Sequence, residues 1–507
     1  MKLAVVSLGA LVCLYMTLRR SVHLFQLESY QFPGYKRAVK THQKGFFAPK
    51  TLFPMAVFAC LAAFAPYFSP LAAAFFVLLN PKQKMKKPLV FTPRVRRLCA
   101  VSVILTAAVC APFALLGVWA LGIAAAAAVI LTPYLLIAWG RVCAPMEKAI
   151  SQGYINDARR ILRDHTNLKV VGITGSFGKT STKYFLYDLL SQKYNVYMTP
   201  GNFNTTLGVT RAVREGLLPQ HEIFLCEMGA RHVGDIKEIC ELAQPDIAVI
   251  TSVGKQHLET FGSLERVLST KLELHDAVKD CGSTFVNVDS APLRDALPKL
   301  EGDIITCGAG GGYHASGITA DKNGLRFTIH TPEGDSQEFS TRLLGDANVQ
   351  NLTLAIACAH RLGVSLRQMV PAVRALKSVP HRLELKNAGD MTMIDDAYNS
   401  NPEGAKMALD ALALFAPCRV LVTPGLVELG ASQQEENRAL GEYAAGCCDL
   451  AIIVGAINRD ELAGGLRSGG MADSQIITAK TIEEALRQLP AGGKTVLLLN
   501  DLPDNYL

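Results

Sequence analysis

The residues best suited to chemistry lie in one glycine-rich stretch, 170–183, which reads VVGITGSFGKTSTK. Such a turn between a buried strand and a helix points backbone N–H groups and the helix N-terminus at a polyphosphate. There Lys179 would reach the β- and γ-phosphates, and Thr180 would give its hydroxyl to Mg²⁺. Ile173 stands where the common GxxxxGK[ST] pattern has its first glycine. We therefore predict a nucleotide-binding site of unusual glycine spacing, formed by Thr174, Gly175, Ser176, Gly178, Lys179, Thr180 and Ser181.

Short apolar segments rich in valine and isoleucine must position this turn. After residue 166 they alternate with stretches of helical spacing, which is typical of parallel sheets with helices on both faces. We expect strands at LKVVGIT, HEIFLCE, DIAVITS, STFVNV, MTMIDD, RVLVT, DLAIIV and KTVLLL. The predicted fold class is α/β, with a boundary at 379–381 between an ATP-binding domain, 168–380, and a shorter domain, 381–507.

The N-terminal part has a different composition. Residues 1–150 carry 17 lysines and arginines against only Glu28 and Glu147. The stretch 3–18 is apolar and ends at Arg19 and Arg20 without a small-residue cleavage site, which indicates a retained membrane anchor. A basic region attached to a larger acidic body argues against nucleic-acid binding and for a membrane protein. We expect an all-α transmembrane region over 1–144 and a linker helix over 145–167.

Two further uncharged stretches, 52–80 and 98–140, suggest how this region crosses the membrane. The segments 19–50 and 81–97 each contain seven lysines and arginines, so the positive-inside rule places both in the cytoplasm. The stretch 52–80, interrupted by three prolines, would then be a re-entrant hairpin or two short helices rather than one tilted helix. The stretch 98–140 would cross out and back, with a turn at 117–122. The expected location is the cell membrane, multi-pass, with the later domains in the cytoplasm.

The thirteen cysteines form no CxxC pair, and their number is odd. This excludes a zinc or disulfide framework of the usual kinds and favours reduced cysteines in domain cores.

Further motifs follow the glycine-rich turn in order. They are GNFNTTLG (201–208), EMGA (227–230), QHLETFGS (256–263), TKLE (270–273), GDANVQN (345–351), HRL (381–383), DDAYNSNP (395–402) and ELG (428–430). With TGSFGKTS they resemble the Mur ligase family, the ATP-dependent amide-forming enzymes of peptidoglycan precursor synthesis, most closely the branch that adds D-alanyl-D-alanine. The resemblance covers roughly residues 168–500. It implies a P-loop central domain and a C-terminal Rossmann-like domain, here in a bacterial cytoplasm.

The resemblance also implies roles for individual residues. Glu227 and His257, each at the end of a predicted strand, would bind Mg²⁺ together with Thr180. Lys271 resembles the lysine that the family carbamylates with CO₂, which turns a cation into an anionic metal ligand. Lys179, Lys271, His257 and Glu227 would be the catalytic group. The nucleotide would also contact Asn348, Asn351, Arg382, Asp396 and Tyr398, and the substrate would contact Asn202 and Asn204.

Several departures concern the substrate side. Membrane segments replace the family's uridine-nucleotide-binding domain, Thr205 replaces an asparagine, and Ala347 replaces a histidine before Asn348. The segment 501–504, DLPD, stands where this branch has a basic, serine-containing turn.

We therefore expect a membrane-anchored ligase that forms an acyl phosphate from ATP and a carboxylate. It would add an amino acid or a dipeptide such as D-alanyl-D-alanine to a lipid-linked or nucleotide-linked cell-wall precursor. Three alternatives stay open. They are an ordinary D-alanyl-D-alanine-adding enzyme with an unusual N-terminus, a non-catalytic nucleotide-binding scaffold among cell-wall synthesis proteins, and a poly-γ-glutamate-type ligase.

Overall fold

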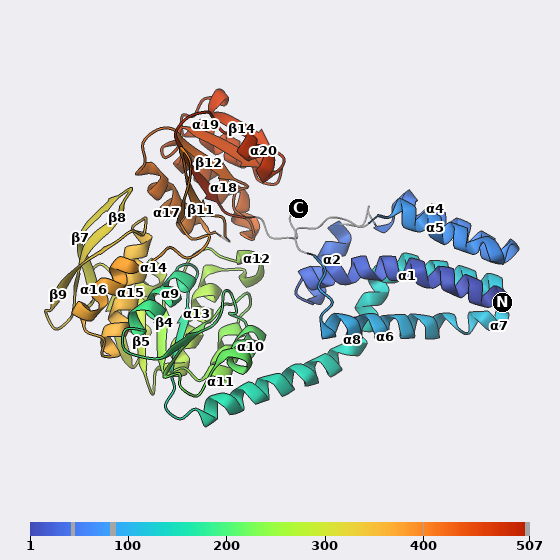
Figure 1. Ribbon diagram of the computed structural model, residues 1–507, viewed down its shortest axis with the longest axis horizontal. Coiled ribbons are helices and arrows are strands. Elements are labelled where there is room, and N and C mark those ends of the chain that lie inside the picture. Colours follow the sequence, from blue (N-terminus) through green and yellow to red (C-terminus); the bar gives the residue numbers. More distant parts are fainter. Residues whose placement is uncertain (42–45, 82–87, 399, 502–507) are drawn as a thin grey trace. The chain divides into compact units, whose positions relative to one another are not determined.

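The computed structural model of the protein describes residues 1–41, 46–81, 88–398 and 400–501 (Figure 1). It divides into two compact units, Met1–Gln152 and Gly153–Leu502. Most of the 501–504 segment and part of the 81–97 basic loop lie outside the described residues.

The first unit is built from helices. They are α1 (Lys2–Leu27), α2 (Phe32–Thr41), α4 (Pro49–Phe64), the 3-10 turn η1 (Pro66–Phe68), α5 (Ser69–Leu79), α6 (Pro93–Cys110), α7 (Phe113–Leu116) and the start of α8 (Val118–Asp164). Proline stands at the first or second position of α4, α5 and α6, where its missing N–H costs no helical hydrogen bond. Thr92 also caps α6, because its hydroxyl accepts a hydrogen bond of 3.3 Å from the Val95 N–H.

The helix boundaries bear on the membrane prediction. The stretch 52–80 forms two short helices, α4 and α5, so the single tilted helix is wrong. The chain turns at Gly117, whose φ of 122° is accessible to glycine, within the expected 117–122. The helix expected over 145–167 continues from the preceding apolar helix as part of the 47-residue α8.

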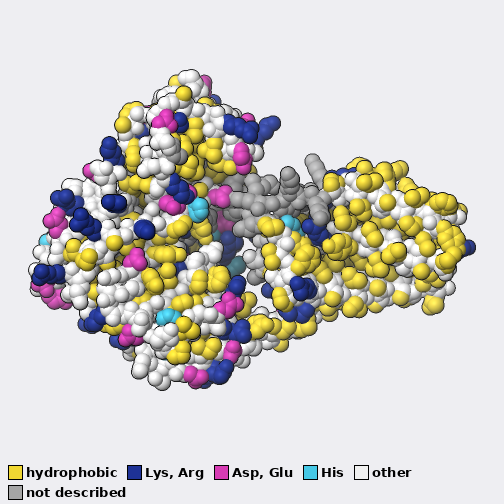
Figure 2. All heavy atoms as spheres, in the orientation of Figure 1, with side chains coloured by type: hydrophobic (Ala, Val, Ile, Leu, Met, Phe, Trp, Pro, Cys, Tyr) yellow, Lys and Arg dark blue, Asp and Glu magenta, His cyan; other side chains and the backbone are white. Residues whose placement is uncertain are grey.

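Three helical segments of the described residues are long and apolar enough to cross a membrane: Lys2–Leu27, Pro93–Leu116 and Val118–Asp164. The visible face of this unit is almost continuously hydrophobic (Figure 2). Most lysine and arginine side chains on that face gather at the end away from the N-terminus. This distribution fits a region with an apolar body and a basic, polar end.

The second unit begins with a parallel sheet in the order β2-β3-β1-β4-β5-β6. Its strands are β1 (Lys169–Thr174), β2 (Val196–Met198), β3 (Ile223–Glu227), β4 (Ile247–Ile250), β5 (Ser283–Asn287) and β6 (Asp303–Cys307). A three-stranded antiparallel sheet follows: β7 (His314–Asp321), β8 (Gly324–His330) and β9 (Ser336–Thr341). Strands β3 and β4 are buried at every position, as expected for a parallel sheet covered on both faces.

Helices cover both faces of the six-stranded sheet. On one face the core includes α9 (Lys179–Leu190), α15 (Ala347–Arg361) and α16 (Leu366–Ala375). On the other face it includes α10 (Thr206–Gly216), α11 (Asp235–Ala243), α13 (Leu264–Val278) and the end of α8. The short helices α12 (Leu258–Phe261) and α14 (Ala291–Ala296) lie beyond the carboxyl ends of β4 and β5 along the chain.

A second six-stranded sheet has the order β10-β11-β15-β12-β13-β14. Its strands are β10 (Glu384–Ala388), β11 (Met391–Asp396), β12 (Arg419–Thr423), β13 (Leu450–Val454), β14 (Ile476–Ala479) and β15 (Lys494–Leu499). All neighbours are parallel except β10 and β11. The helices are α17 (Pro402–Ala413), α18 (Gln433–Ala445), α19 (Arg459–Ser468) and α20 (Ile482–Arg487). The predicted α/β fold class is confirmed.

Candidate nucleotide and metal site

The glycine-rich turn joins β1 to α9 as predicted. Gly175 has a φ of 151° and Gly178 a φ of 80°. A side chain would also find no room, since a Cβ at Gly175 would lie 2.1 Å from Thr251 Oγ1 and a Cβ at Gly178 would lie 2.2 Å from Asn351 Oδ1. Ser252, which follows β4, accepts two hydrogen bonds from the turn, each of 2.8 Å. Its carbonyl accepts from the Ser176 N–H, and its hydroxyl accepts from the Phe177 N–H. The turn is thereby fixed by its neighbours and not only by its own conformation.

The Lys179 side chain bends back over this turn. Its ammonium donates hydrogen bonds to the carbonyls of Gly175 at 2.5 Å and Ser176 at 3.3 Å. Burial lowers the pKa of Lys179 to about 8, with Arg382 adding to this effect and Glu227 opposing it. A polyphosphate held by the turn would meet this ammonium directly.

Glu227 ends β3 and is almost fully buried next to Thr180. Its Oε1 accepts hydrogen bonds from the Thr180 hydroxyl at 3.2 Å and from the Asn204 amide at 3.1 Å. Burial opposes ionisation, but Lys183 and Lys179 hold the pKa of Glu227 below its ordinary value. A carboxylate and a hydroxyl this close are the hard oxygen ligands that suit Mg²⁺, so the residues fit that ion.

Lys183 was not among the site residues predicted from the sequence. Its side chain is fully buried and forms an ion pair with Glu227, with 2.9 Å between Nζ and Oε2. It also donates to the carbonyls of Thr199 at 2.9 Å and Gly201 at 2.7 Å. Lys183 thus joins the P-loop helix to the start of the GNFN segment. The available signal was its spacing, because residues four apart share one helix face and Lys183 lies four after Lys179.

The other two expected metal ligands, His257 and Lys271, have contacts of their own. His257, with a φ of 52°, directs Nδ1 to the Glu428 carboxylate, and Arg231 lies 3.6 Å from the same carboxylate. Burial lowers the pKa of His257, and the Glu428 contact opposes the shift. Among the described residues, neither His257 nor Lys271 makes a hydrogen bond or ion pair with Glu227. Glu428 was part of a recognised motif, but its contact with His257 was not predicted.

Lys271 is buried on α13, with 2% of its surface exposed. Burial lowers the pKa of its amine to about 7, and the charge of Lys179 lowers it further, whereas Asp235 and Glu273 oppose the shift. No hydrogen bond or ion pair holds its amine within the described part of the chain. The amine is therefore partly neutral near pH 7.

The expected adenine-side asparagines lie one turn apart on α15. Asn348 donates to the Leu344 carbonyl at 2.7 Å, and Asn351 Oδ1 lies 3.4 Å from the Thr182 hydroxyl and directly over Gly178. Both side chains are buried. Asn351 thus has a visible structural role, which is to pack against the nucleotide-binding turn.

Residues of the second α/β domain form a separate group. The Arg382 guanidinium lies over the Tyr398 ring, 4.3 Å from its centroid, and the Tyr398 hydroxyl accepts a hydrogen bond of 3.3 Å from the Asn202 amide. Burial raises the pKa of Asp396 to about 7, although Arg382 and the Leu383 N–H oppose it. These contacts bring together three of the residues assigned to the nucleotide and one assigned to the substrate.

His381, Glu384 and Asp395 also lie close enough to share a metal ion. However, the Lys386 ammonium contacts Asp395 at 2.6 Å and Glu384 at 3.0 Å. We assign this cluster to an ion-pair network at the start of the second domain, because His381 Nδ1 and the Lys386 ammonium already share the Asp395 Oδ2 atom.

Comparisons with known proteins decide the family. The Mur ligase middle domain matches residues 173–359, and the Mur ligase, glutamate ligase domain matches residues 381–499. The chain is similar to the UDP-N-acetylmuramoyl-tripeptide–D-alanyl-D-alanine ligase of Escherichia coli, at 30% identity over 327 residues, which cover 62% of this chain and 72% of that one. This chain belongs to the Mur ligase family. The resemblance read from the motifs is confirmed.

Other relatives of this Mur ligase agree. The ligase of the same name from Mycobacterium tuberculosis is 37% identical over 259 residues, 49% of each chain, so this chain spans about half the length of that relative. MurF from Acinetobacter baumannii has a TM-score of 0.63 at 29% identity and covers 69% of this chain and 77% of its own. The MurF ligase of Thermotoga maritima, solved in complex with ADP, has a TM-score of 0.62 at 26% identity and covers 70% and 81%.

Proposed function

We propose that this protein is a membrane-anchored, ATP-dependent amide ligase that releases ADP. It would add an amino acid or a dipeptide such as D-alanyl-D-alanine to a carboxylate of a cell-wall precursor. The observation that carries this proposal is the contact of Thr180 and Asn204 with the buried Glu227 carboxylate beside the P-loop lysine. The names of the similar ligases support the choice of the dipeptide.

The proposed reaction has two steps. A substrate carboxylate oxygen attacks the γ-phosphorus of ATP, the bond to the β-phosphate oxygen breaks, and ADP leaves. The substrate amine then attacks the acyl carbon, inorganic phosphate leaves, and the amine loses a proton to form the amide. Both steps bring anions together, so cationic groups must neutralise them.

The chain supplies these charges around its P-loop. Lys179 would exchange its two carbonyl partners for phosphate oxygens, and protonation below its lowered pKa of about 8 keeps it cationic at neutral pH. Thr180 and Glu227 would hold Mg²⁺, which neutralises phosphate charge when bound. Lys183 keeps Glu227 ionised and ready for a cation.

We further propose that Lys271 is carbamylated. Only a neutral amine attacks CO₂, and the pKa of about 7 gives Lys271 a substantial neutral fraction at physiological pH. The new N–C bond releases a proton and replaces a buried cation near Lys179 with an anion. The carbamate would serve as a ligand of a second metal ion with His257.

The membrane anchoring rests on three apolar helical segments of the first unit. The basic segments between the apolar stretches favour a cytoplasmic position for the ligase domains. ATP and nucleotide-linked precursors would be available on that side.

Release of ADP by the full-length protein in nanodiscs tests the activity. D-alanyl-D-alanine would be offered with either UDP-linked muramoyl tripeptide or its lipid-linked equivalent, and Lys179→Ala would serve as the inactive control. We expect sustained ADP release only when both a carboxylate and an amine are present, because without the amine the acyl phosphate of the first step is not consumed. ATP binding without ADP release for any pair would favour the scaffold instead.

A further inference from the structure

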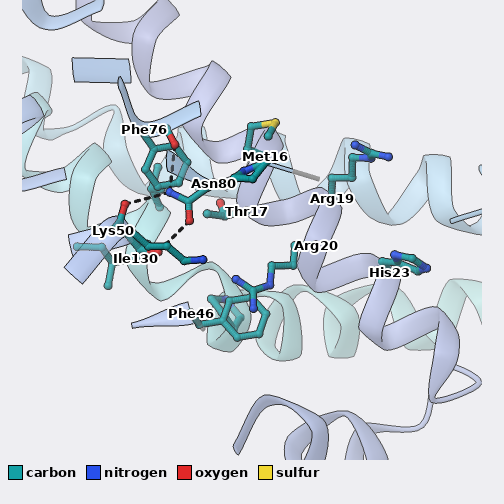
Figure 3. Close-up of a pocket in the computed structure, with 14 residues that line it drawn as sticks. Met16, Thr17, Arg19, Arg20, His23, Phe46, Lys50, Phe76, Asn80 and Ile130 are labelled. Atoms are coloured by element: carbon teal, nitrogen blue, oxygen red, sulfur yellow. Dashed lines mark hydrogen bonds between the residues drawn. The ribbon is translucent and has the colours of Figure 1, made fainter. Parts of the chain in front are cut away.

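The first unit contains a cavity among α1, α4, α5 and α8 that the ligase chemistry does not use (Figure 3). Four basic side chains line it: Arg19, Arg20, His23 and Lys50. No aspartate or glutamate lines it among the described residues. Arginine stays charged under physiological conditions, and Lys50 is exposed to solvent. The cavity therefore suits an anion.

Phe46 and Asn80 position the basic side of the cavity. The Arg20 guanidinium lies over the Phe46 ring, 4.2 Å from its centroid. The Asn80 amide donates hydrogen bonds of 3.0 Å to the carbonyls of Lys50 and Phe76, and its oxygen accepts one of 3.2 Å from the Thr51 hydroxyl. Asn80 thus ties the start of α4 to the end of α5 and fixes the backbone from which Lys50 extends. In Figure 3, Arg20 lies on Phe46 and Lys50 extends into the same region, while Arg19 and His23 lie further along.

Apolar side chains form the rest of the wall, including Phe76, Val129 and Ile130. Along α1, Leu8, Leu11 and Tyr15 are exposed before Arg19 is reached. The apolar part, 3–18, rises about 24 Å as a helix, which approaches the thickness of the hydrocarbon layer. The basic side chains therefore lie at the level where lipid headgroups begin. The exposed apolar side chains of α1 offer a surface for the hydrocarbon chain of a lipid.

We propose that this cavity binds the diphosphate headgroup of a membrane lipid, with the lipid chain along the apolar wall. The charge decides between lipids. A zwitterionic headgroup would bring its own cation to four basic side chains, and a phosphodiester carries a single negative charge. A diphosphate carries more negative charge and offers several oxygens to arginine and lysine donors.

This inference deepens the proposed function, because a cell-wall precursor carried on such a lipid would be held by the membrane region of the ligase. That link rests on the proposed function. The binding itself does not, so it can be measured without ATP. A lipid that binds without turnover would leave the cavity assignment standing and count against the ligase.

The test measures retention of a polyprenyl diphosphate by the full chain in phosphatidylcholine nanodiscs, with Lys50→Gln and Arg20→Gln as variants. Loss of one charge-assisted contact should weaken binding about tenfold or more. Arg20→Gln also removes the contact with Phe46, whereas Lys50 is exposed, so Lys50→Gln separates charge from packing. Lys36→Gln is the matched control, since Lys36 is exposed in the same unit and lines no part of the cavity.

The control Lys179→Ala should bind the lipid normally while binding ATP more weakly than the wild type. Equal binding by wild type and Lys50→Gln would overturn the proposal. Equal affinity for phosphatidylglycerol would also overturn it, because it would indicate a general anionic-lipid surface. Binding of inorganic pyrophosphate as tightly as the lipid would overturn it as well, because it would indicate a soluble ligand.

Discussion

Lys183 and Glu227 form an ion pair in the interior of the ATP-binding domain, where their side chains are 0% and 2% exposed. Lys183→Met would leave the carboxylate buried without this cation and would free the carbonyls of Thr199 and Gly201. Removing one partner of a buried pair costs about 3–5 kcal/mol. We expect the free energy of unfolding of the ATP-binding domain to fall by this amount, as measured by urea unfolding.

Lys193→Met is the matched control. Lys193 also donates to a backbone carbonyl, that of Gly363 at 2.9 Å, but it is exposed, so its loss should change stability little. The double variant Lys183→Met, Glu227→Gln should be less destabilised than the sum of the two single variants, because the buried charge disappears. Additive effects would show that the pair is not coupled.

Lys179→Ala should remove the cation that meets the phosphates. Hydrogen bonds to charged groups contribute about 1.5–3 kcal/mol, so ATP affinity should fall by tenfold to about a hundredfold. Isothermal titration with a non-hydrolysable ATP analogue measures this, with Lys193→Ala as control. Wild-type affinity in Lys179→Ala would refute the assignment of the turn.

Lys271→Ala should lose most activity if the carbamate is a metal ligand. A loss of about 3 kcal/mol in transition-state stabilisation corresponds to roughly a hundredfold in rate. Formate or acetate should restore part of the activity, because a short carboxylate can occupy the vacated anionic position. Near-normal turnover without rescue would exclude the carbamate.

The lowered pKa of Lys271 also predicts how stability depends on pH. Between about 7 and 10.5 the unfolded lysine binds a proton that the folded one lacks, so the free energy of unfolding rises with pH across this window. Lys271→Met removes this contribution and leaves that of Lys179 in place. In CO₂-free buffer, the variant should gain stability over wild type as the pH falls from 10 to 7. A difference independent of pH would contradict the lowered pKa.

Cysteine labelling tests the membrane topology. The native Cys281, exposed in the ATP-binding domain, reports the side of the membrane on which that domain lies, which we predict to be the cytoplasm, and Cys60→Ala removes an exposed cysteine of α4. In this background an impermeant maleimide added to intact cells should label Trp119→Cys but neither Cys281 nor Lys40→Cys. Labelling of Lys40→Cys from outside would invert the predicted orientation. The positions Lys44 and Lys86, in the same two basic loops, lie outside the described residues.

The sequence predicted the buried elements better than the exposed ones. All eight expected strands are present, because most of them are short runs rich in valine, isoleucine or leucine. The strands β7 and β9 were missed because many of their residues are polar and exposed, so their pattern resembles a loop. The strand β8 was missed although its buried Leu325, Phe327 and Ile329 alternate with less buried residues. The strand β2 has only three residues and gives little signal.

The same reasoning explains which contacts of the candidate site could be predicted from the sequence. The P-loop residues are close in sequence, so their spacing alone predicted their geometry. Lys183 was missed because a lysine on a helix is ordinarily solvated, and only the fold brings the 199–201 segment over it. The contact of His257 with Glu428 joins residues 171 positions apart, and local sequence carries no information about such a pairing.

The packing of Asn351 over Gly178 has an evolutionary consequence. The amide oxygen lies where a side chain at position 178 would begin, and the backbone there has a φ of 80°. Any substitution at 178 would displace both the turn and α15, and no shortening of residue 351 could relieve the backbone strain. The two positions are therefore constrained unequally: a smaller residue at 351 leaves the turn unstrained, whereas no replacement at 351 makes position 178 tolerant of a side chain. In a lineage of such proteins, variation at 351 should occur without variation at 178.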